Sequence, residues 1–423
     1  QNSMYLLGGL YLKTNQKANA RNAFQYSAYN SSNEKQQQVS RFNYAKLSYE
    51  LGYQNVALKE MKAYLNDYPN SEYDTEAKEI LVNLLTNTSN FNEALALYNS
   101  FSKPTLGMQK VYPRILYGRA IENINDQQLN DADDLLNKVI SNQYAAAIIP
   151  YAYFWKGEIA YRQQQYDAAI RYLASFLQSN PPAQGEANTA AARYNTGYAW
   201  MQKENYQQAL SNFESVTKNI SATSSSMEQD AFLRSADCYF MLKNFAQANT
   251  MYERITALAL SQSDYALYQK AMIAGIKSSA EKIRILGTLA KQYPSSNLVQ
   301  DVNMEIALTY IADEKFTDAV PYLDKVLVSG NEGMKPRALL KKGLAYYNAN
   351  NNKDALSSYK ELIQKYPQSA EADEALVNIK DIYVEEGRPG EYVELMRQNG
   401  KTVSATEADE LTYNAAMLKY NAN

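Results

Sequence analysis

Residues 150–182 read PYAYFWKGEIAYRQQQYDAAIRYLASFLQSNPP, and this stretch sets the plan for the whole chain. Apolar side chains recur with helical spacing in its two halves, which the polar run 163–165 separates. Asp167 follows that run, where a carboxylate suits the exposed amides at the start of a helix. Gly157 stands inside the first helix, where glycine costs about 1 kcal/mol relative to alanine. The stretch therefore predicts two helices joined by a short turn, with another helix passing close to Gly157.

The same hairpin recurs along the chain when every unit is aligned on the alanine that opens its second helix. This alanine stands at Ala20, Ala57, Ala94, Ala132, Ala169, Ala209, Ala248, Ala319 and Ala355. Neighbouring alanines lie 36 to 40 residues apart, except across one interval of 71 residues. That interval holds a degenerate unit in which Lys282 takes the alanine's place. Such a period predicts about ten hairpins stacked into a solenoid.

Two other positions recur together with the alanine. The residue twelve positions before it is small in all of these units but the third, which has Val82. The small residues are Gly8, Ala45, Ala120, Gly157, Gly197, Ala236, Ala307 and Gly343. A large side chain stands four positions after it, at Phe24, Met61, Tyr98, Leu136, Leu173, Phe213, Tyr252, Leu323 and Tyr359. We expect small residues where helices cross and large ones where units stack. In particular, Gly157, Gly197 and Gly343 are predicted to lie too close to their own second helix for a large side chain.

Together these positions resemble the tetratricopeptide repeat (TPR), and the resemblance covers residues 1–372. It implies an all-α fold, an open right-handed superhelical solenoid of about ten TPR helical hairpins plus a degenerate C-terminal repeat. Residues 373–423 are expected to form this degenerate repeat and a truncated half repeat, and we expect sequence to continue beyond both ends. Bends are expected near 102–112 and 217–228, where proline, glycine or serine interrupts the pattern.

A short motif narrows the resemblance. Several units end in Tyr-Pro-x-Ser, at 68–71, 293–296 and 366–369. The first continues as Tyr-Pro-Asn-Ser-Glu-Tyr over 68–73, which resembles the bacterial cell-envelope branch of the family. That branch includes outer-membrane assembly lipoproteins and the periplasmic cell-division coordinator. The resemblance therefore implies a periplasmic or outer-membrane-associated location.

The composition argues against several classes of function. A net charge of −3 gives no case for a nucleic-acid-binding protein. Histidine is absent, so the commonest general base and metal ligand is lacking, and the single cysteine cannot form an intrachain disulfide. No apolar run is long enough to span a membrane. The acidic cluster at 131–134 lacks the glycine and the ligand spacing of a calcium loop.

We therefore predict a protein without catalytic residues, metal or cofactor. The chain holds no glycine-rich phosphate loop and no zinc-type spacing. Two alternatives stay open. One is a glycosidase built from helical hairpins, which works with two carboxylates and needs no histidine. The other is a glycan-binding module, since the chain has 37 tyrosines that could stack on sugars, although it has only two tryptophans.

In the resembled family, the first helices of the repeats line a concave groove that holds the partner. The corresponding positions here, taken as the candidate partner-binding residues, are Tyr151, Phe154, Glu158, Arg162, Tyr194, Tyr198, Asp237 and Phe240. The groove is then aromatic and mildly acidic. We expect Tyr194 and Tyr198 to act as anchors between Glu158 and Asp237, which would favour a partner segment with lysine or arginine. The alternative is that the tyrosines only fill space between neighbouring first helices.

The resemblance implies a non-catalytic scaffold for protein–protein interactions that binds peptide or protein segments, as part of a bacterial envelope assembly. The partner's identity and the oligomeric state do not follow from the sequence.

Overall fold

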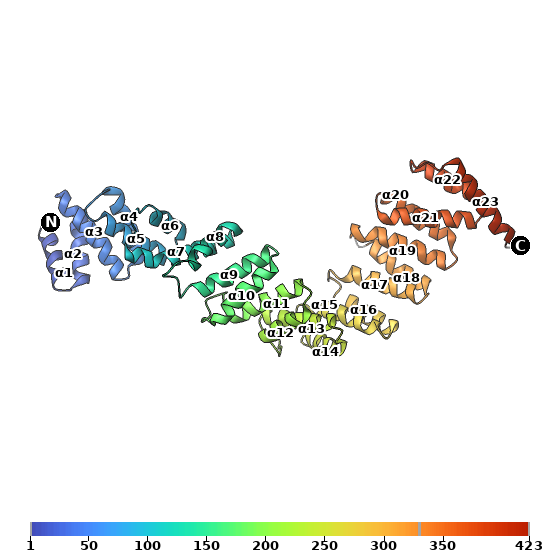
Figure 1. Ribbon diagram of the computed structural model, residues 1–423, viewed down its shortest axis with the longest axis horizontal. Helices are drawn as coiled ribbons and strands as arrows, with labels where there is room; N and C mark the ends of the chain where they lie inside the picture. The colour runs from blue at the N-terminus through green and yellow to red at the C-terminus, as the bar shows by residue number, and fades with distance from the viewer. Residues whose placement is uncertain (1, 329–330, 422–423) are drawn as a thin grey trace. The chain divides into compact units, whose positions relative to one another are not determined.

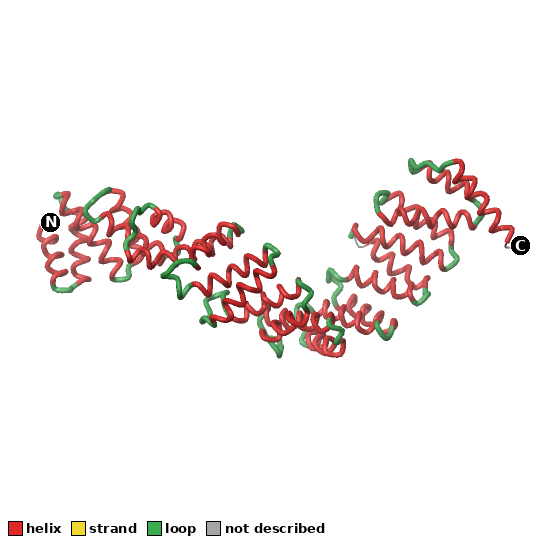
Figure 2. Tube along the Cα trace, viewed as in Figure 1, coloured by secondary structure: helices red, strands yellow, loops and turns green. Residues whose placement is uncertain are grey.

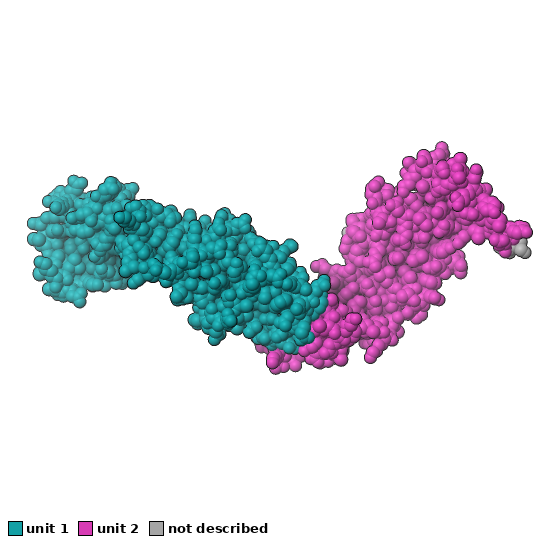
Figure 3. Space-filling model, in the orientation of Figure 1, with its two compact units in different colours: residues 1–216 teal, residues 217–423 magenta. Residues whose placement is uncertain are grey.

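A computed structural model describes residues 2–328 and 331–421 of the chain (Figure 1). All regular elements named in these ranges are helices, and an isolated bridge between Gln184 and Ala187 is the extended pairing they contain (Figure 2). The predicted fold class, an all-α solenoid of helical hairpins, is confirmed. The chain divides into two compact units, Gln1–Val216 and Thr217–Asn423, which Figure 3 colours separately.

Unit 1 consists of six hairpins. Its helices are α1 (Asn2–Lys13), α2 (Lys17–Asn30), α3 (Glu34–Glu50), α4 (Gln54–Asp67), α5 (Asp74–Asn87), α6 (Phe91–Asn99), α7 (Leu106–Asn125), α8 (Leu129–Ile140), α9 (Ile149–Arg162), α10 (Tyr166–Ser179), α11 (Thr189–Gln202) and α12 (Tyr206–Val216). Each odd-numbered helix packs on the even-numbered helix that follows it, and each hairpin packs on the next, as far as this unit extends.

Unit 2 contains five further hairpins and a last helix in its described part. Its helices are α13 (Ser226–Met241), α14 (Phe245–Ala257), α15 (Ser263–Gly275), α16 (Ser279–Gln292), α17 (Val299–Ala312), α18 (Phe316–Val328), the 3₁₀ helix η1 (Glu332–Met334), α19 (Lys335–Asn348), α20 (Asn352–Lys365), α21 (Ala370–Glu385), α22 (Pro389–Gln398) and α23 (Ala405–Asn421). The hairpin α15–α16 is the unit in which Lys282 replaces the alanine.

The turn inside each hairpin has a common construction. One residue takes a left-handed backbone conformation at Asn15, Gly52, Ser89, Gln127, Gln164, Glu204, Lys243, Glu314, Asn350 and Gly387. The next N–H then reaches back to the carbonyl five residues earlier, as Gln165 does to Ala160 at 2.8 Å. This bond closes the end of the first helix in the manner of a Schellman motif. The turn of α15–α16 differs, because Ser278 donates to Ala274 at 3.0 Å and no residue of 276–278 is left-handed.

The recurring glycine and the recurring large residue meet inside one hairpin. A Cβ on Gly157 would lie 2.6 Å from Leu173 Cγ, and one on Gly197 would lie 2.7 Å from a ring carbon of Phe213. A Cβ on Gly343 would lie 2.3 Å from a ring carbon of Tyr359. The predicted close crossing at the three glycines is confirmed. The large residue therefore packs on the glycine of its own hairpin, and is not only a contact between units.

The two segments in which we expected bends are partly helical, and the bends themselves stay a prediction. Most of 102–112 is helical, since α7 begins at Leu106 and continues through Pro113. Thr105 caps this helix by accepting a hydrogen bond from the Met108 amide at 3.3 Å, which explains the early start. The other segment, 217–228, begins at the first residue of unit 2 and enters α13 at Ser226.

The segment before α13 is attached to the body of unit 2. Ile220 is buried, and its carbonyl accepts hydrogen bonds from the Arg254 guanidinium at 2.9 and 3.3 Å. Ser225 and Glu228 then form a capping box at the start of the helix. Between these two anchors Ser221 is exposed and Ser224 is partly buried.

The end of the described chain shares its core with the last complete repeat. Ile379 and Tyr392 of α21 and α22 lie in one buried cluster with Tyr359 of α20, and Leu411 and Ala415 of α23 join it. Tyr413 and Tyr420 on α23 are exposed. The division of the chain at residue 372 stays a prediction. Among the described residues, no helix combines the length and the apolar character that crossing a bilayer requires.

Candidate protein-binding surface

In unit 1, the predicted anchors Tyr194 and Tyr198 lie together on α11. Their rings meet edge to face with centroids 5.0 Å apart, and both are half-buried. Each also contacts the ring of Phe213 on α12, at 6.1 Å for Tyr194 and 5.3 Å for Tyr198. Because Phe213 packs on Gly197, the two tyrosines brace the crossing of α11 and α12 while part of each ring stays accessible.

A polar bridge lies beside these tyrosines and joins two consecutive first helices. Glu158 on α9 accepts a hydrogen bond from Asn195 on α11 at 2.8 Å. Its other oxygen accepts from Arg162, one turn further along α9, at 3.0 Å. The side chains of Glu158 and Arg162 keep 20% and 35% of their surface exposed. The carboxylate is therefore partly neutralised, and the surface of α9 and α11 combines aromatic rings with a balanced ion pair.

The structure places two other candidates, Tyr151 and Phe154, in the core. Both are buried on α9, and the Tyr151 hydroxyl donates to the Pro182 carbonyl at 2.9 Å. Phe154 packs against Trp155 and Phe176, with centroids 5.3 Å away in each case. These aromatic side chains fill the space around their first helix, which is the role that the sequence pattern could not separate from binding.

Asp237 in unit 2 is also internal, because only 6% of its surface is exposed. Its carboxylate accepts hydrogen bonds from the hydroxyls of Tyr252 at 2.6 Å and Tyr265 at 3.2 Å, and from Arg234 at 2.6 Å. These partners come from α13, α14 and α15, so Asp237 joins two neighbouring hairpins. Its part in flanking a bound segment, as expected from the sequence, is not available to a carboxylate with these contacts.

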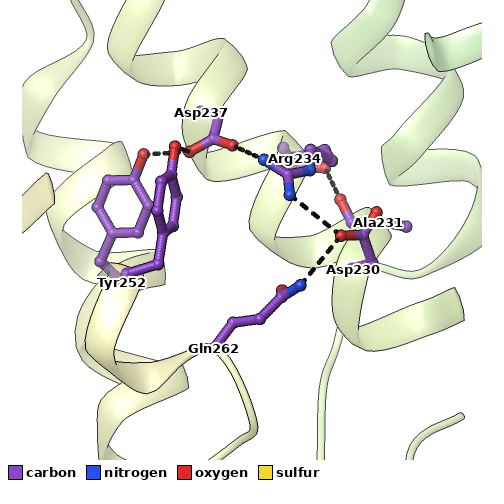
Figure 4. A network of polar contacts seen from close by, with 8 residues as sticks. Asp230, Ala231, Arg234, Asp237, Tyr252 and Gln262 are labelled. Atoms are coloured by element: carbon purple, nitrogen blue, oxygen red, sulfur yellow. Dashed lines mark hydrogen bonds and ion pairs between the residues drawn. The ribbon is translucent and has the colours of Figure 1, made fainter. Parts of the chain in front are cut away.

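The network around Asp237 extends outward through Arg234. The guanidinium also reaches Asp230 at 3.3 Å, and Asp230 accepts from Gln262 at 3.5 Å (Figure 4). Burial raises the pKa of Asp237 above its ordinary value, although Tyr252 and Arg234 act in the opposite direction. Burial, together with the Asp237 charge, raises the pKa of Tyr265 to about 12. The network is thus a polar core that fixes α13, α14 and α15 to one another.

Phe240, the last candidate, is half-buried near the end of α13. Its ring meets that of Phe245 on α14 edge to face, with centroids 5.5 Å apart. It closes the hairpin turn of α13–α14. The structure therefore places Glu158, Arg162, Tyr194 and Tyr198 on the consecutive first helices α9 and α11, which the bond from Asn195 to Glu158 joins, while the remaining candidates lie in the core or beside the turn of α13–α14.

Unit 2 also contains a cavity of about 620 Å³ that we did not predict from the sequence. It lies over α15, between α14 and α16, and is lined by Phe245, Ala246, Asn249, Glu253, Leu267, Lys270, Ile273, Ala274, Ile276, Lys277, Ser278, Glu281, Arg284, Ile285 and Thr288. The cavity coincides with the degenerate hairpin, so the loss of the alanine at Lys282 was the signal that could have located it.

The acidic cluster at 131–134 takes part in packing. Asp133 accepts a hydrogen bond from Asn137 at 3.0 Å and forms an ion pair with the buried Lys156 of α9. Within 2–328 and 331–421, no three side chains of the metal-ligating types come together.

Sequence profiles of the tetratricopeptide repeat match residues 125–183, 156–222, 230–258 and 337–369. No curated protein sequence matches the chain.

Among solved structures, the C-terminal part of a TPR repeat-containing protein from Cytophaga hutchinsonii is 14% identical, with a TM-score of 0.38, over 70% of this chain and 99% of that one. The anaphase-promoting-complex hetero-tetramer Cut9–Hcn1 is 11% identical, with a TM-score of 0.33, over 98% of this chain and 96% of the other. IFIT1 with Gppp-AAAA is 14% identical, with a TM-score of 0.39, over 90% of both chains.

Proposed function

We propose that this tetratricopeptide-repeat protein is a non-catalytic scaffold that binds segments of other proteins on the first-helix surface of α9 and α11. Tetratricopeptide repeats indicate a scaffold for protein–protein interactions. The observation that carries the more specific proposal is the accessible pair Tyr194 and Tyr198, which lies beside the bridge from Glu158 to Asn195. Tyrosine offers a large contact area and a hydroxyl at a low cost in conformational entropy, which is why it is enriched where proteins bind.

The charge of this surface points to the kind of segment it would bind. Glu158 is the one predicted flanking carboxylate that keeps an exposed part, and Arg162 and Asn195 already occupy its two oxygens. The surface therefore offers little net charge. The expectation of a segment carrying lysine or arginine rested on two flanking carboxylates, and Asp237 is bound inside unit 2. A segment with an aromatic or aliphatic anchor for the tyrosine pair fits better, and its binding should depend only weakly on salt.

We also propose that the protein works in the bacterial cell envelope, on the basis of the motif at 68–73. In the folded chain this motif follows α4, where Ser71 accepts a hydrogen bond from the Tyr64 hydroxyl at 2.9 Å and Asn70 is left-handed. Its packing role is compatible with any location. The proposal is tested by separating the periplasm, membranes and cytoplasm of the native host and detecting the protein with an antibody. Recovery in the cytoplasm alone would refute it.

The scaffold proposal is tested by selecting random 16-residue displayed peptides against the full chain. We expect peptides with aromatic or aliphatic anchors to be enriched, and the bound peptide to slow amide hydrogen exchange in α9 and α11. A glycan array run in parallel tests the alternative of a glycan-binding module. Binding of glycans without any enriched peptide would overturn the proposal, and so would peptides that protect neither helix.

A further inference from the structure

The cavity in unit 2 is a groove between two second helices. Phe245, Asn249 and Glu253 recur at intervals of four residues and present one face of α14 to it. Glu281, Ile285 and Thr288, at intervals of four and three residues, present one face of α16 to it. The side chains of α15, which packs on both helices, form the floor. The groove thus lies on the second helices of unit 2 and shares no residue with the surface of α9 and α11.

The groove exists because α15 lacks the bulky side chains with which its neighbours end. The last three residues of α13, α17 and α19 are Tyr239-Phe240-Met241, Tyr310-Ile311-Ala312 and Tyr346-Tyr347-Asn348. At the second-to-last position these helices carry Phe240, Ile311 and Tyr347, whereas α15 carries Ala274 there. Ala274 lines the groove at the place where a large side chain is missing. The hollow is therefore encoded in the sequence of the degenerate hairpin.

Apolar side chains continue from the groove onto the neighbouring turns. Ile276 lines the groove, and 58% of its surface is exposed. Met241, the last residue of α13, and Leu242, which follows it in the turn before Phe245, are exposed as well. Large exposed apolar side chains that adjoin a groove are typical of surfaces that bind another molecule.

The charged side chains of the groove lining form two ion pairs and leave one lysine without an ion-pair partner among the described residues. Lys270 pairs with Glu253 at 3.4 Å, and Arg284 pairs with Glu281 at 2.6 Å. Both carboxylates of the lining are thereby matched. The remaining cation, Lys277, is exposed beside Ile276 and forms no ion pair with a described residue. A ligand would meet an apolar floor and one cation available at the rim.

We propose that this groove binds an acidic amphipathic helix of a partner protein, with its apolar side chains over Ala274 and Ile276 and a carboxylate on Lys277. A channel bounded by two helices is the shape in which an amphipathic helix lays its apolar face, through anchors at intervals of three and four residues. The cavity volume of about 620 Å³ falls within the range of sites that hold a ligand. The cation selects for acidic residues beside the anchors.

The test uses two fluorescein-labelled 18-residue helical peptides and the full chain. Both carry leucines along one face at intervals of three and four residues, and glutamates or lysines on the remaining positions. Fluorescence anisotropy should give a dissociation constant at least about tenfold lower for the glutamate peptide, because one ion pair replaces one like-charge contact. Equal affinities of the two peptides, or no binding of the acidic one at millimolar concentration, would overturn the proposal.

Two variants locate the binding. Ala274→Tyr places a large side chain where α13 and α17 carry Phe240 and Ile311, and should weaken binding of the acidic peptide about tenfold or more by filling the groove. Lys277→Glu should weaken it by a similar factor and reduce its preference over the lysine peptide. The matched control is Lys243→Glu, a lysine in the preceding hairpin turn that does not line the groove, which should bind like the wild type. Circular dichroism checks folding, and Lys277→Glu on the exposed rim keeps the test decisive if Ala274→Tyr misfolds.

Other occupants would give different results. If a second copy of this chain occupies the groove, sedimentation should show dimers that Ala274→Tyr dissociates, which would contradict the proposal. If peptide binding is unchanged in both Ala274→Tyr and Lys277→Glu, the peptide lies elsewhere and the groove is not its site. Peptide binding to α9 and α11 is measured separately, so the failure of one surface leaves the other untouched.

Discussion

The hairpins α11–α12 and α15–α16 are both repeats of the solenoid, but their two helices meet in different ways. In α11–α12, Gly197 receives the ring of Phe213, and a left-handed residue closes the turn. In α15–α16, Lys270 stands at the position of Gly197, a different glycine, Gly275, approaches the flexible side chain of Lys282, and no residue of the turn is left-handed. The first hairpin is closed by a ring packed on a glycine, while the second lacks that pair and lines a groove.

Polar contacts attach the degenerate hairpin α15–α16 to the preceding hairpin α13–α14. Tyr265 on α15 and Tyr252 on α14 both donate to the buried Asp237 of α13. A repeat can therefore lack the recurring alanine and glycine and still pack on its neighbours when hydrogen bonds to a buried carboxylate help to hold it. The positions that no longer serve the helix crossing can then form a binding surface.

The largest effect is expected from Asp237→Ala. It leaves two tyrosine hydroxyls without their acceptor and the partly buried Arg234 without its nearest carboxylate. Breaking such a buried network costs about 3–5 kcal/mol. Urea denaturation should show the loss, and hydrogen exchange should place it in α13–α16. Asp237→Asn keeps an oxygen acceptor and should lose less. Equal and small losses in both variants would mean that the polar core does not hold the degenerate hairpin.

Gly197→Leu tests the hairpin that is closed by a ring packed on a glycine. The new side chain would collide with Phe213, and overpacking of this kind costs about 3 kcal/mol. Because each hairpin of a solenoid contacts only its neighbours, faster hydrogen exchange should be concentrated in α9–α12. An undisturbed exchange pattern in α11 and α12 would contradict the tight crossing.

Replacing a glycine by alanine should have opposite effects on stability at Gly197 and at Gly287, although both effects are smaller than those above. Gly197→Ala should cost about 1–2 kcal/mol, since the clash with Phe213 outweighs the higher helix propensity of alanine. Gly287→Ala, in α16 of the degenerate hairpin, should stabilise by about 0.5–1 kcal/mol, because no atom lies within 4 Å of the added carbon. Thermal unfolding measures both. Effects of the same sign would remove the distinction between the two hairpins.

The repeat itself could be predicted from the sequence because its positions recur many times. The alanine and the large residue after it are observed in nine units, and the small residue before it in eight of them. Gly197 with Phe213 is one example of a contact that this register predicts. The hairpin boundaries follow from the same register. Even the departure at Lys282 was visible in the sequence as a break in the period.

The candidate site was less predictable because the pattern does not separate packing from binding. Tyr151 and Tyr194 occupy similar stretches of successive first helices, yet one donates to a backbone carbonyl in the core and the other is half-exposed. Asp237 looked like a surface carboxylate because its partners Tyr252 and Tyr265 lie 15 and 28 residues away in the chain. Only the three-dimensional arrangement brings them together.

The proposed scaffold function is tested most directly by titrating a selected peptide into Tyr198→Ala and into the matched control Tyr172→Ala. Tyr172 is a half-buried tyrosine of α10 that stacks on Tyr153 with centroids 6.2 Å apart, so both changes remove a packed ring from unit 1. Calorimetry should show that Tyr198→Ala weakens binding by more than about 1 kcal/mol while Tyr172→Ala binds like the wild type. Equal affinity of the two folded variants would mean that the tyrosines of α11 only pack, and the surface of α9 and α11 would not be the binding site.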